Sequence, residues 1–346
     1  KNPRLGAAMS EFYTTMGKRR LIQFFESPES GGVCINRFPN LNNGRRGNYR
    51  ELSCDADKEG IHVGETNLEG DNNVRNGIIY PLDELLAYTD DVRDNLHKER
   101  IRWDIAAQLP EFMNNDIRLQ YYTLGMDHRT GIPTSIVYPY LDDCWLEDDT
   151  YFFYYNGYNE GMKNYQGDEL NIQGIYDVTF RVPPVPRTGT YEIRMGVSTE
   201  SSWRGICQVY FGTDPANPVP SGIPVDMALG GQKRNLNGTI YESNVGWEPD
   251  TDDDDYNAEV DKRMRNNGFM KGPEYFTETP GGIDTGRSLE KATRRIIVRQ
   301  HMDAGKVYYL RFKSVQDILW KQLFINYLEW CPKEVYDNPI EPEDIW

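Results

Sequence analysis

The chain contains 346 residues, of which 38 are Lys or Arg and 54 are Asp or Glu, and its formal net charge is −16. That length exceeds one ordinary domain and suffices for two hydrophobic cores. The acidity excludes a partner held mainly through phosphates, because nucleic acids and anionic membranes bind basic surfaces. Aromatic side chains make up 12% of the residues, and the apolar area that they supply predicts a folded protein rather than a disordered one.

Neither a membrane span nor a metal-binding cysteine motif is expected. The sequence has no run of about 18 apolar residues, which a transmembrane helix requires. It starts at Lys1 without an initiator Met or a signal-like segment, which predicts a processed or trimmed product. The five cysteines lack C-x-x-C spacing, and two alternatives stay open for them: a Cys34–Cys54 disulfide, or buried free thiols.

The first 88 residues are expected to form short strands that close on a helix. Weak alternation over residues 60–69 is followed by turn residues and by the segment Asn-Gly-Ile-Ile-Tyr at 76–80. After Pro81, the residues Leu82, Leu85 and Leu86 recur at helical spacing. The spacing predicts a helix with one apolar face.

This order of segments resembles the closing third of a fasciclin domain, in which a G-x-x-V-N strand precedes an Asn-Gly-hydrophobic pair and a terminal helix. Tyr80 replaces the common His of the family, and the matching residues are Asn76, Gly77, Ile78, Ile79, Leu82, Asp83, Leu85 and Leu86. Residues 12–17 and 21–24 stand where the family has its middle strands. The resemblance implies an α+β domain at residues 1–88 that lacks its first half, or whose first half precedes Lys1 in the gene product.

Residues 89–130 are expected to form a helical connection. Thr89 suits an N-cap, Asp90 and Asp91 suit a first turn, and apolar residues recur at helix-like intervals until Pro110. The pattern predicts a helix that continues to about residue 113. His97 lies on this stretch, and we expect it to be a surface or packed residue rather than a ligand.

Residues 131–346 have the pattern of an antiparallel β-sandwich. Apolar residues alternate with polar ones over 175–182 and again over 191–197, and a Pro-rich turn separates the two runs. The alternation predicts two strands that are each buried on one face only. Further strands are expected at 206–211, 295–300, 307–315 and 323–330.

The segments at 178–195, 305–315 and 323–332 resemble galactose-binding-like jelly rolls, with Asn326 where that pattern often has Asp. A fasciclin-like region followed by this sandwich resembles a group of fasciclin-containing surface lipoproteins of Bacteroidetes. The resemblance implies a mixed α+β and all-β fold class and a cell-surface position on the bacterial outer membrane. It also implies a lipid anchor upstream of Lys1 as the only membrane attachment. The implied partners are an outer-membrane transporter and other surface lipoproteins, or an extracellular glycan.

Standard catalytic signatures are missing from the sequence, including G-x-S-x-G, H-E-x-x-H and the P-loop motif. No catalytic residue is therefore predicted. Glycosidases need only two suitably spaced acids, however, so a carbohydrate-active hydrolase that uses an Asp/Glu pair in the sandwich is the alternative function. An acid-aromatic cluster of Asp142, Asp143 and Asp148 beside Trp145 could serve it, although a solvated turn is the simpler interpretation.

Aromatic residues beside expected loops provide the candidate ligand-binding residues, because flat rings stack on sugar faces or anchor protein interfaces. These candidates are Trp203, Arg204, Trp247, Tyr154 and Tyr158. For each aromatic ring among them, packing in the core is the competing interpretation.

An acidic run at residues 250–255 is a weak candidate for calcium, with Asp250, Asp252 and Asp254 as ligands. The run lacks the Gly and distal Glu of an EF-hand loop, so we expect a mobile solvated loop, and no cofactor is predicted.

Together these observations predict a non-enzymatic cell-surface binding or adhesion lipoprotein, which could serve as an accessory subunit of a SusCD-type nutrient-uptake complex.

Overall fold

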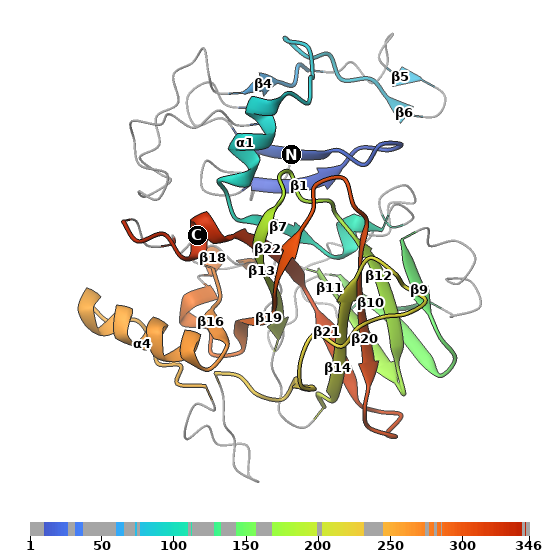
Figure 1. The fold of residues 1–346 in the computed structure, drawn as a ribbon, viewed down its shortest axis with the longest axis vertical. Helices are drawn as coiled ribbons and strands as arrows, with labels where there is room; N and C mark the ends of the chain where they lie inside the picture. Colours follow the sequence, from blue (N-terminus) through green and yellow to red (C-terminus); the bar gives the residue numbers. More distant parts are fainter. Residues whose placement is uncertain are drawn as a thin grey trace.

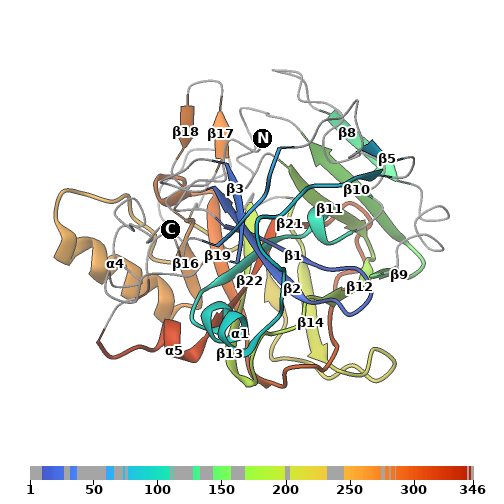
Figure 2. The ribbon, with the colours of Figure 1, turned by 90° about the horizontal axis from the view of Figure 1, so that it is seen from above.

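The fold consists mostly of antiparallel β-sheets with few helices (Figure 1 and Figure 2). The computed structural model describes residues 10–26, 32–36, 60–65, 73–74, 77–109, 112, 128–132, 143–156, 168–198, 203–231, 245–273, 277–279, 282–284, 286–340 and 343. These ranges include both runs of alternating residues that predicted the β-sandwich. The two runs form strands of antiparallel sheets, so the prediction of a β-sandwich is confirmed.

Two five-stranded sheets form the centre of the molecule. The first has the strand order β15-β14-β20-β12-β9. Its strands are β15 (Val225–Asp226), β14 (Ile206–Gly212), β20 (Tyr308–Ser314), β12 (Asp177–Val182) and β9 (Cys144–Leu146). The second has the order β16-β19-β13-β22-β7. Its strands are β16 (Phe269–Lys271), β19 (Ala292–Met302), β13 (Gly189–Ser198), β22 (Tyr327–Pro332) and β7 (Ile101–Asp104).

Apolar side chains from both sheets fill the space between them, as the period-two alternation requires. Val178 and Phe180 of β12 belong to the same buried cluster as Ile193 and Met195 of β13. The predicted strands at 206–211, 295–300 and 307–315 are confirmed by β14, β19 and β20.

The prediction of a single strand over residues 323–330 is wrong. The chain divides at Asn326 into β21 (Gln322–Ile325) and β22, and these strands join different sheets. β21 pairs with β11 (Asp168–Gly174) in a third sheet of order β21-β11-β10-β8, which also contains β10 (Thr150–Asn156) and β8 (His128–Ile132). The backbone N–H of Asn326 donates to the Gly196 carbonyl, and its own carbonyl accepts from Ile105, so the crossing point is hydrogen-bonded to two neighbouring segments.

The N-terminal part contains a four-stranded sheet of order β1-β2-β3-β4. Its strands are β1 (Ser10–Thr14), β2 (Leu21–Glu26), β3 (Val33–Ile35) and β4 (Ile61–His62). Phe12 and Leu21 of this sheet belong to the same buried cluster as the sandwich residues. The division into domains at residues 88 and 130 stays a prediction.

The helix expected after Pro81 is not formed, so this prediction is wrong. Residues 79–89 are irregular, and Leu85 and Leu86 are exposed. A helix there would need a surface to cover its apolar face, and packing rather than propensity supplies most helical stability.

Two short hairpins are also present, β5 (Asn73–Val74) with β6 (Gly77–Ile78), and β17 (Thr277–Thr279) with β18 (Gly282–Asp284).

The helix predicted from Thr89 is confirmed at its start and wrong in its length. α1 (Asp90–His97) has Thr89 as its N-cap, and the Thr89 side chain accepts a hydrogen bond from the Val92 N–H. It ends at His97, after which β7 and the 3₁₀ helix η4 (Ala106–Gln108) follow. Ile101 is buried in β7, where it pairs with Trp330 across the strands, so the apolar residues that suggested a continuing helix serve the second sheet instead.

The acidic run at 250–255 opens a helix rather than a loop, so the loop prediction is wrong. α4 (Asp254–Asn266) has Asp253 as its N-cap, and the Asp253 carboxylate accepts from the Tyr256 N–H. Carboxylates at a helix N-terminus are stabilised by its unpaired N–H groups and by the helix dipole. The described residues also form the short helices η7 (Gly286–Ser288) and α5 (Lys333–Tyr336).

Candidate ligand-binding site

Two half-exposed tryptophans lie together at one end of the sandwich. Trp203 and Trp320 are 48% and 50% exposed, and their ring centroids are 5.8 Å apart with an interplanar angle of 81°. Leu319, which precedes Trp320, is also exposed. We call Trp203, Leu319 and Trp320 the aromatic patch. Contiguous exposed apolar patches, unlike single exposed side chains, often mark binding sites, so this patch is the candidate site.

The aromatic patch is built by two segments that are far apart in the sequence. Trp203 precedes β14, and Trp320 lies in the connection from β20 to β21, at the end of the molecule opposite the β1–β4 sheet (Figure 1). The Trp203 carbonyl accepts from the Gln322 N–H, and the Gly205 N–H donates to the Gln322 carbonyl, each at 3.0 Å. These backbone hydrogen bonds hold the segment of Trp203 beside the segment of Trp320.

Arg204 and Lys321 pack against the residues that carry the aromatic patch. The Arg204 side chain is buried, its guanidinium lies 3.7 Å from the centroid of the Phe324 ring, and its Nη1 donates to the Gln322 side chain at 2.8 Å. Lys321 Nζ lies 4.5 Å from the Trp320 ring centroid and donates to the Arg204 carbonyl. Arg204 is thus a packed positioning residue, whereas Lys321 places a cation against one of the exposed rings.

A third exposed ring stands near the connection that carries Trp320. Tyr151, 48% exposed, lies over Gly174, whose N–H donates to the Lys321 carbonyl. Gly174 has a φ of +101°, and a Cβ there would lie 2.1 Å from the Asp149 carbonyl oxygen and 2.9 Å from the Tyr151 ring. Only glycine allows this close approach of backbone and ring.

The structure places Tyr154 and Trp247 outside the aromatic patch. The prediction that Tyr154 lies in or beside a loop is wrong, because it belongs to strand β10 and its side chain is fully buried against Phe112. A buried ring offers no face to a ligand. Trp247 packs against a small cluster around α4, where Lys271 Nζ lies 5.9 Å from its ring. Tyr158 lies outside the described residues.

The calcium candidates do not converge. The Asp250 carboxylate accepts from Lys271 and Arg287, and these cations lower the pKa of Asp250 against the opposing effect of its burial. Asp252 is exposed, and Asp254 lies in the first turn of α4. In the part of the chain that the structure describes, no group of three or more His, Cys, Asp or Glu residues could hold a metal ion.

The acid-aromatic cluster of the hydrolase alternative is only partly visible. Asp143 is buried and ion-paired with Arg19 and Arg181, Asp148 is exposed, and Asp142 lies outside the described residues. Trp145 packs against Tyr309 with ring centroids 5.7 Å apart. A glycosidase acid needs a raised pKa, and among the described carboxyl groups every clearly shifted pKa is lowered.

The thiols and His97 are accounted for by packing. Cys144, Cys207 and Cys331 are buried free thiols, and Cys34 Sγ lies 3.2 Å from His62 Nδ1. Cys54 lies outside the described residues, so the Cys34–Cys54 disulfide stays a prediction. His97 Nδ1 lies 2.8 Å from Tyr191 Oη, which docks the end of α1 on the second sheet.

Sequence reasoning missed Trp320, the partner of Trp203 in the aromatic patch. The sequence did contain a signal: the segment Asp-Ile-Leu-Trp-Lys at 317–321 lies in the connection between two predicted strands. A tryptophan in such a connection has no place in the alternation of either strand.

No protein-family model and no curated protein matches this chain. Among the described residues, no helix is both long and apolar enough to cross a membrane.

Proposed function

We propose that the protein is a non-enzymatic cell-surface binding protein that captures an extracellular glycan at the aromatic patch. The observation that carries the proposal is the pair of half-exposed, nearly perpendicular rings of Trp203 and Trp320. The face of one ring can stack on a pyranose ring while the other forms a wall beside it, and Lys321 supplies a hydrogen-bond donor nearby.

The size of the aromatic patch favours a sugar over a protein partner. A stable protein interface usually buries about 800 Å² on each side, whereas this patch consists of two indole rings and one leucine. Its position at the end of a β-sandwich, between strand ends, is where such sandwiches carry their ligand loops.

The finer assignments belong to the same proposal. The sandwich is a galactose-binding-like jelly roll, and the N-terminal sheet is the closing part of a fasciclin domain. The protein is a lipoprotein held at the bacterial outer membrane, where it serves as an accessory of a SusCD-type uptake complex. The resemblances in the sequence support these assignments. A native pull-down in mild detergent tests the accessory role, which requires stoichiometric recovery of an outer-membrane transporter.

Glycan binding is tested by a glycan array followed by calorimetric titration with the best ligand. Trp203→Ala and Trp320→Ala are each expected to weaken binding by about 5-fold or more, since loss of one stacked ring costs about 1–3 kcal/mol. Ile223→Ala, which removes another exposed apolar side chain, is the matched control. Equal weakening by all three variants, or no glycan bound at all, would contradict the proposal.

A further inference from the structure

The middle strand of the second sheet carries charges on a face that the alternation assigned to solvent. In β13, Glu192 and Arg194 are fully buried, so the prediction that this strand is buried on one face only is wrong. Glu329 of the neighbouring strand β22 and Arg294 of β19 are buried beside them. Charges without water must be paired almost completely, because removal of one partner leaves an uncompensated buried charge.

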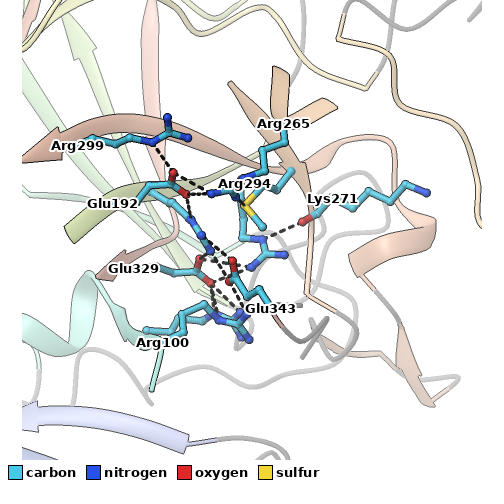
Figure 3. A network of polar contacts seen from close by, with 11 residues as sticks. Arg100, Glu192, Arg265, Lys271, Arg294, Arg299, Glu329 and Glu343 are labelled. Atoms are coloured by element: carbon cyan, nitrogen blue, oxygen red, sulfur yellow. Dashed lines mark hydrogen bonds and ion pairs between the residues drawn. The ribbon is translucent and has the colours of Figure 1, made fainter. Parts of the chain in front are cut away.

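Glu192 and Glu329 each receive several guanidinium groups (Figure 3). Glu192 accepts from Arg194, Arg265 and Arg299 at 2.7–3.0 Å. Glu329 accepts from Arg102 at 2.7 Å and from Arg294 at 3.4 Å. Both carboxylates belong to strands of the sheet, so their positions are fixed by the fold.

Glu343 reaches this network from outside the sheet. Arg194 Nη1 and Nη2 donate to its two carboxylate oxygens at 2.6 and 2.7 Å, which is the bidentate geometry of the strongest guanidinium–carboxylate pairs. Arg100 adds a third donor at 3.0 Å. Figure 3 shows the Glu343 carboxylate beside that of Glu329, close to Arg100.

The Glu343 side chain is enclosed, whereas Ile340, three residues earlier, is exposed. Among the described residues that follow Val335, none up to Ile340 is fully buried, and Ile340 is 87% exposed. The Glu343 side chain, by contrast, is only 9% exposed. The carboxylate is therefore held, much as a ligand would be, by guanidinium groups that belong to strand β13 or directly precede strand β7.

We propose that Arg100 and Arg194 form a carboxylate-binding site on the outer face of the second sheet, and that the chain's own Glu343 is its occupant in this structure. The ligand class is a carboxylate, supplied either by the C-terminal segment or by a free organic acid. The site is separate from the aromatic patch and does not depend on the function proposed for it.

The arginines remain in place when Glu343 is absent because other groups hold them. Arg194 Nε still donates to Glu192, and Arg100 Nε still lies 3.5 Å from Glu329. Loss of the Glu343 carboxylate thus removes the acceptor of Arg194 Nη2, while Arg194 Nη1 keeps Glu329 at 3.4 Å and the guanidinium stays oriented. Such a site favours any carboxylate small enough to enter.

The test is chemical rescue of the full chain by acetate. Glu343→Ala is expected to lower the melting temperature by about 5 °C or more. Acetate should then raise it again in a concentration-dependent manner, as mass action requires. Chloride at the same ionic strength should not. Asp337→Ala, which removes an exposed carboxylate from the same C-terminal segment, is the matched control and should show neither loss nor rescue.

Two results would overturn the proposal: a melting temperature of Glu343→Ala equal to that of the wild type, or equal effects of acetate and chloride. If Glu343→Ala is unfolded when it is purified, its refolding yield is compared in acetate and in chloride. A higher yield in acetate supports the proposal, and equal yields overturn it. Glu343→Gln, which keeps the side-chain volume, should lose stability but should not be rescued by acetate, because the amide still fills the space beside Arg194 and cannot offer it two acceptor oxygens.

Discussion

Phe211 and Trp330 meet edge to face across the centre of the sandwich, with ring centroids 6.4 Å apart and an interplanar angle of 72°. Phe211 belongs to β14 in the first sheet, and Trp330 belongs to β22 in the second. The Trp330 Nε1–H donates to the Pro183 carbonyl at 3.2 Å, so the polar edge of the buried indole is also satisfied. This pair joins the two sheets.

Trp330→Ala is expected to lower the free energy of unfolding by about 3–5 kcal/mol, because it removes a fully buried ring and leaves a cavity between the sheets. Chemical denaturation monitored by circular dichroism measures the loss. Trp203→Ala is the matched control, since Trp203 is 48% exposed and its removal should change stability by less than about 1 kcal/mol. A similar loss in both variants would show that Trp203 is a packing residue and would weaken the aromatic patch as a binding site.

Gly174→Ala is expected to destabilise the protein by about 2–3 kcal/mol, because the residue has a φ of +101° and a Cβ would collide with the Asp149 carbonyl oxygen. The same denaturation experiment measures it. Gly212→Ala is the control, because nothing lies within 4 Å of a Cβ at that position. If the two substitutions have equal effects, the tight approach of Tyr151 to Gly174 is not a constraint on the fold.

Acid should weaken the buried charge network. Neighbouring arginines lower the pKa of Glu329 and Glu343, against the opposing effect of burial. A carboxyl whose pKa is lower in the folded than in the unfolded chain contributes stability above its ordinary pKa of 4.5, and that contribution is lost as the pH falls below 4.5. The difference in unfolding free energy between the wild type and Glu343→Gln should therefore be large at pH 7 and should shrink below pH 4.5.

Denaturant titrations of both proteins at several pH values from 7 to about 3 measure this difference. Asp337→Asn, an exposed carboxyl on the same segment, should differ little from the wild type at every pH. A difference between the wild type and Glu343→Gln that does not depend on pH would mean that Glu343 contributes by packing rather than by charge.

The sandwich could be predicted from the sequence because alternation reports which face of a strand is buried. In β12 and the residue before it, the apolar set Tyr176, Val178, Phe180 and Val182 is buried as the pattern required. The same rule failed for Glu192 and Arg194 because it assigns polar residues to solvent, and it cannot show that arginines from other strands and a carboxylate of the C-terminal segment will surround them. Pairing between distant residues decides that burial.

Only one of the two tryptophans of the aromatic patch could be predicted from the sequence, for a related reason. Trp203 was identified because it stands between strands, but its partner Trp320 is 117 residues away and is brought to it by backbone bonds between β21 and the start of β14. Tyr154 was misplaced because Thr150–Asn156, although rich in aromatic residues, forms a strand with one face in the core. The sequence shows the chemistry of a ring, whereas the pairing of strands decides whether it is exposed.

Asp253→Ala is expected to destabilise the start of α4 by about 1 kcal/mol, since the Asp253 carboxylate accepts the Tyr256 N–H at 3.1 Å as the N-cap of the helix. Asp252→Ala is the matched control, because Asp252 is exposed and lies one residue before the cap. Hydrogen exchange of the amides in α4 measures the local effect, with faster exchange expected in the first variant only. The two variants also test the interpretation of the acidic run. A calcium site would make Asp252→Ala reduce a calcium-induced rise in melting temperature, whereas a capping role makes only Asp253→Ala destabilising, with or without calcium.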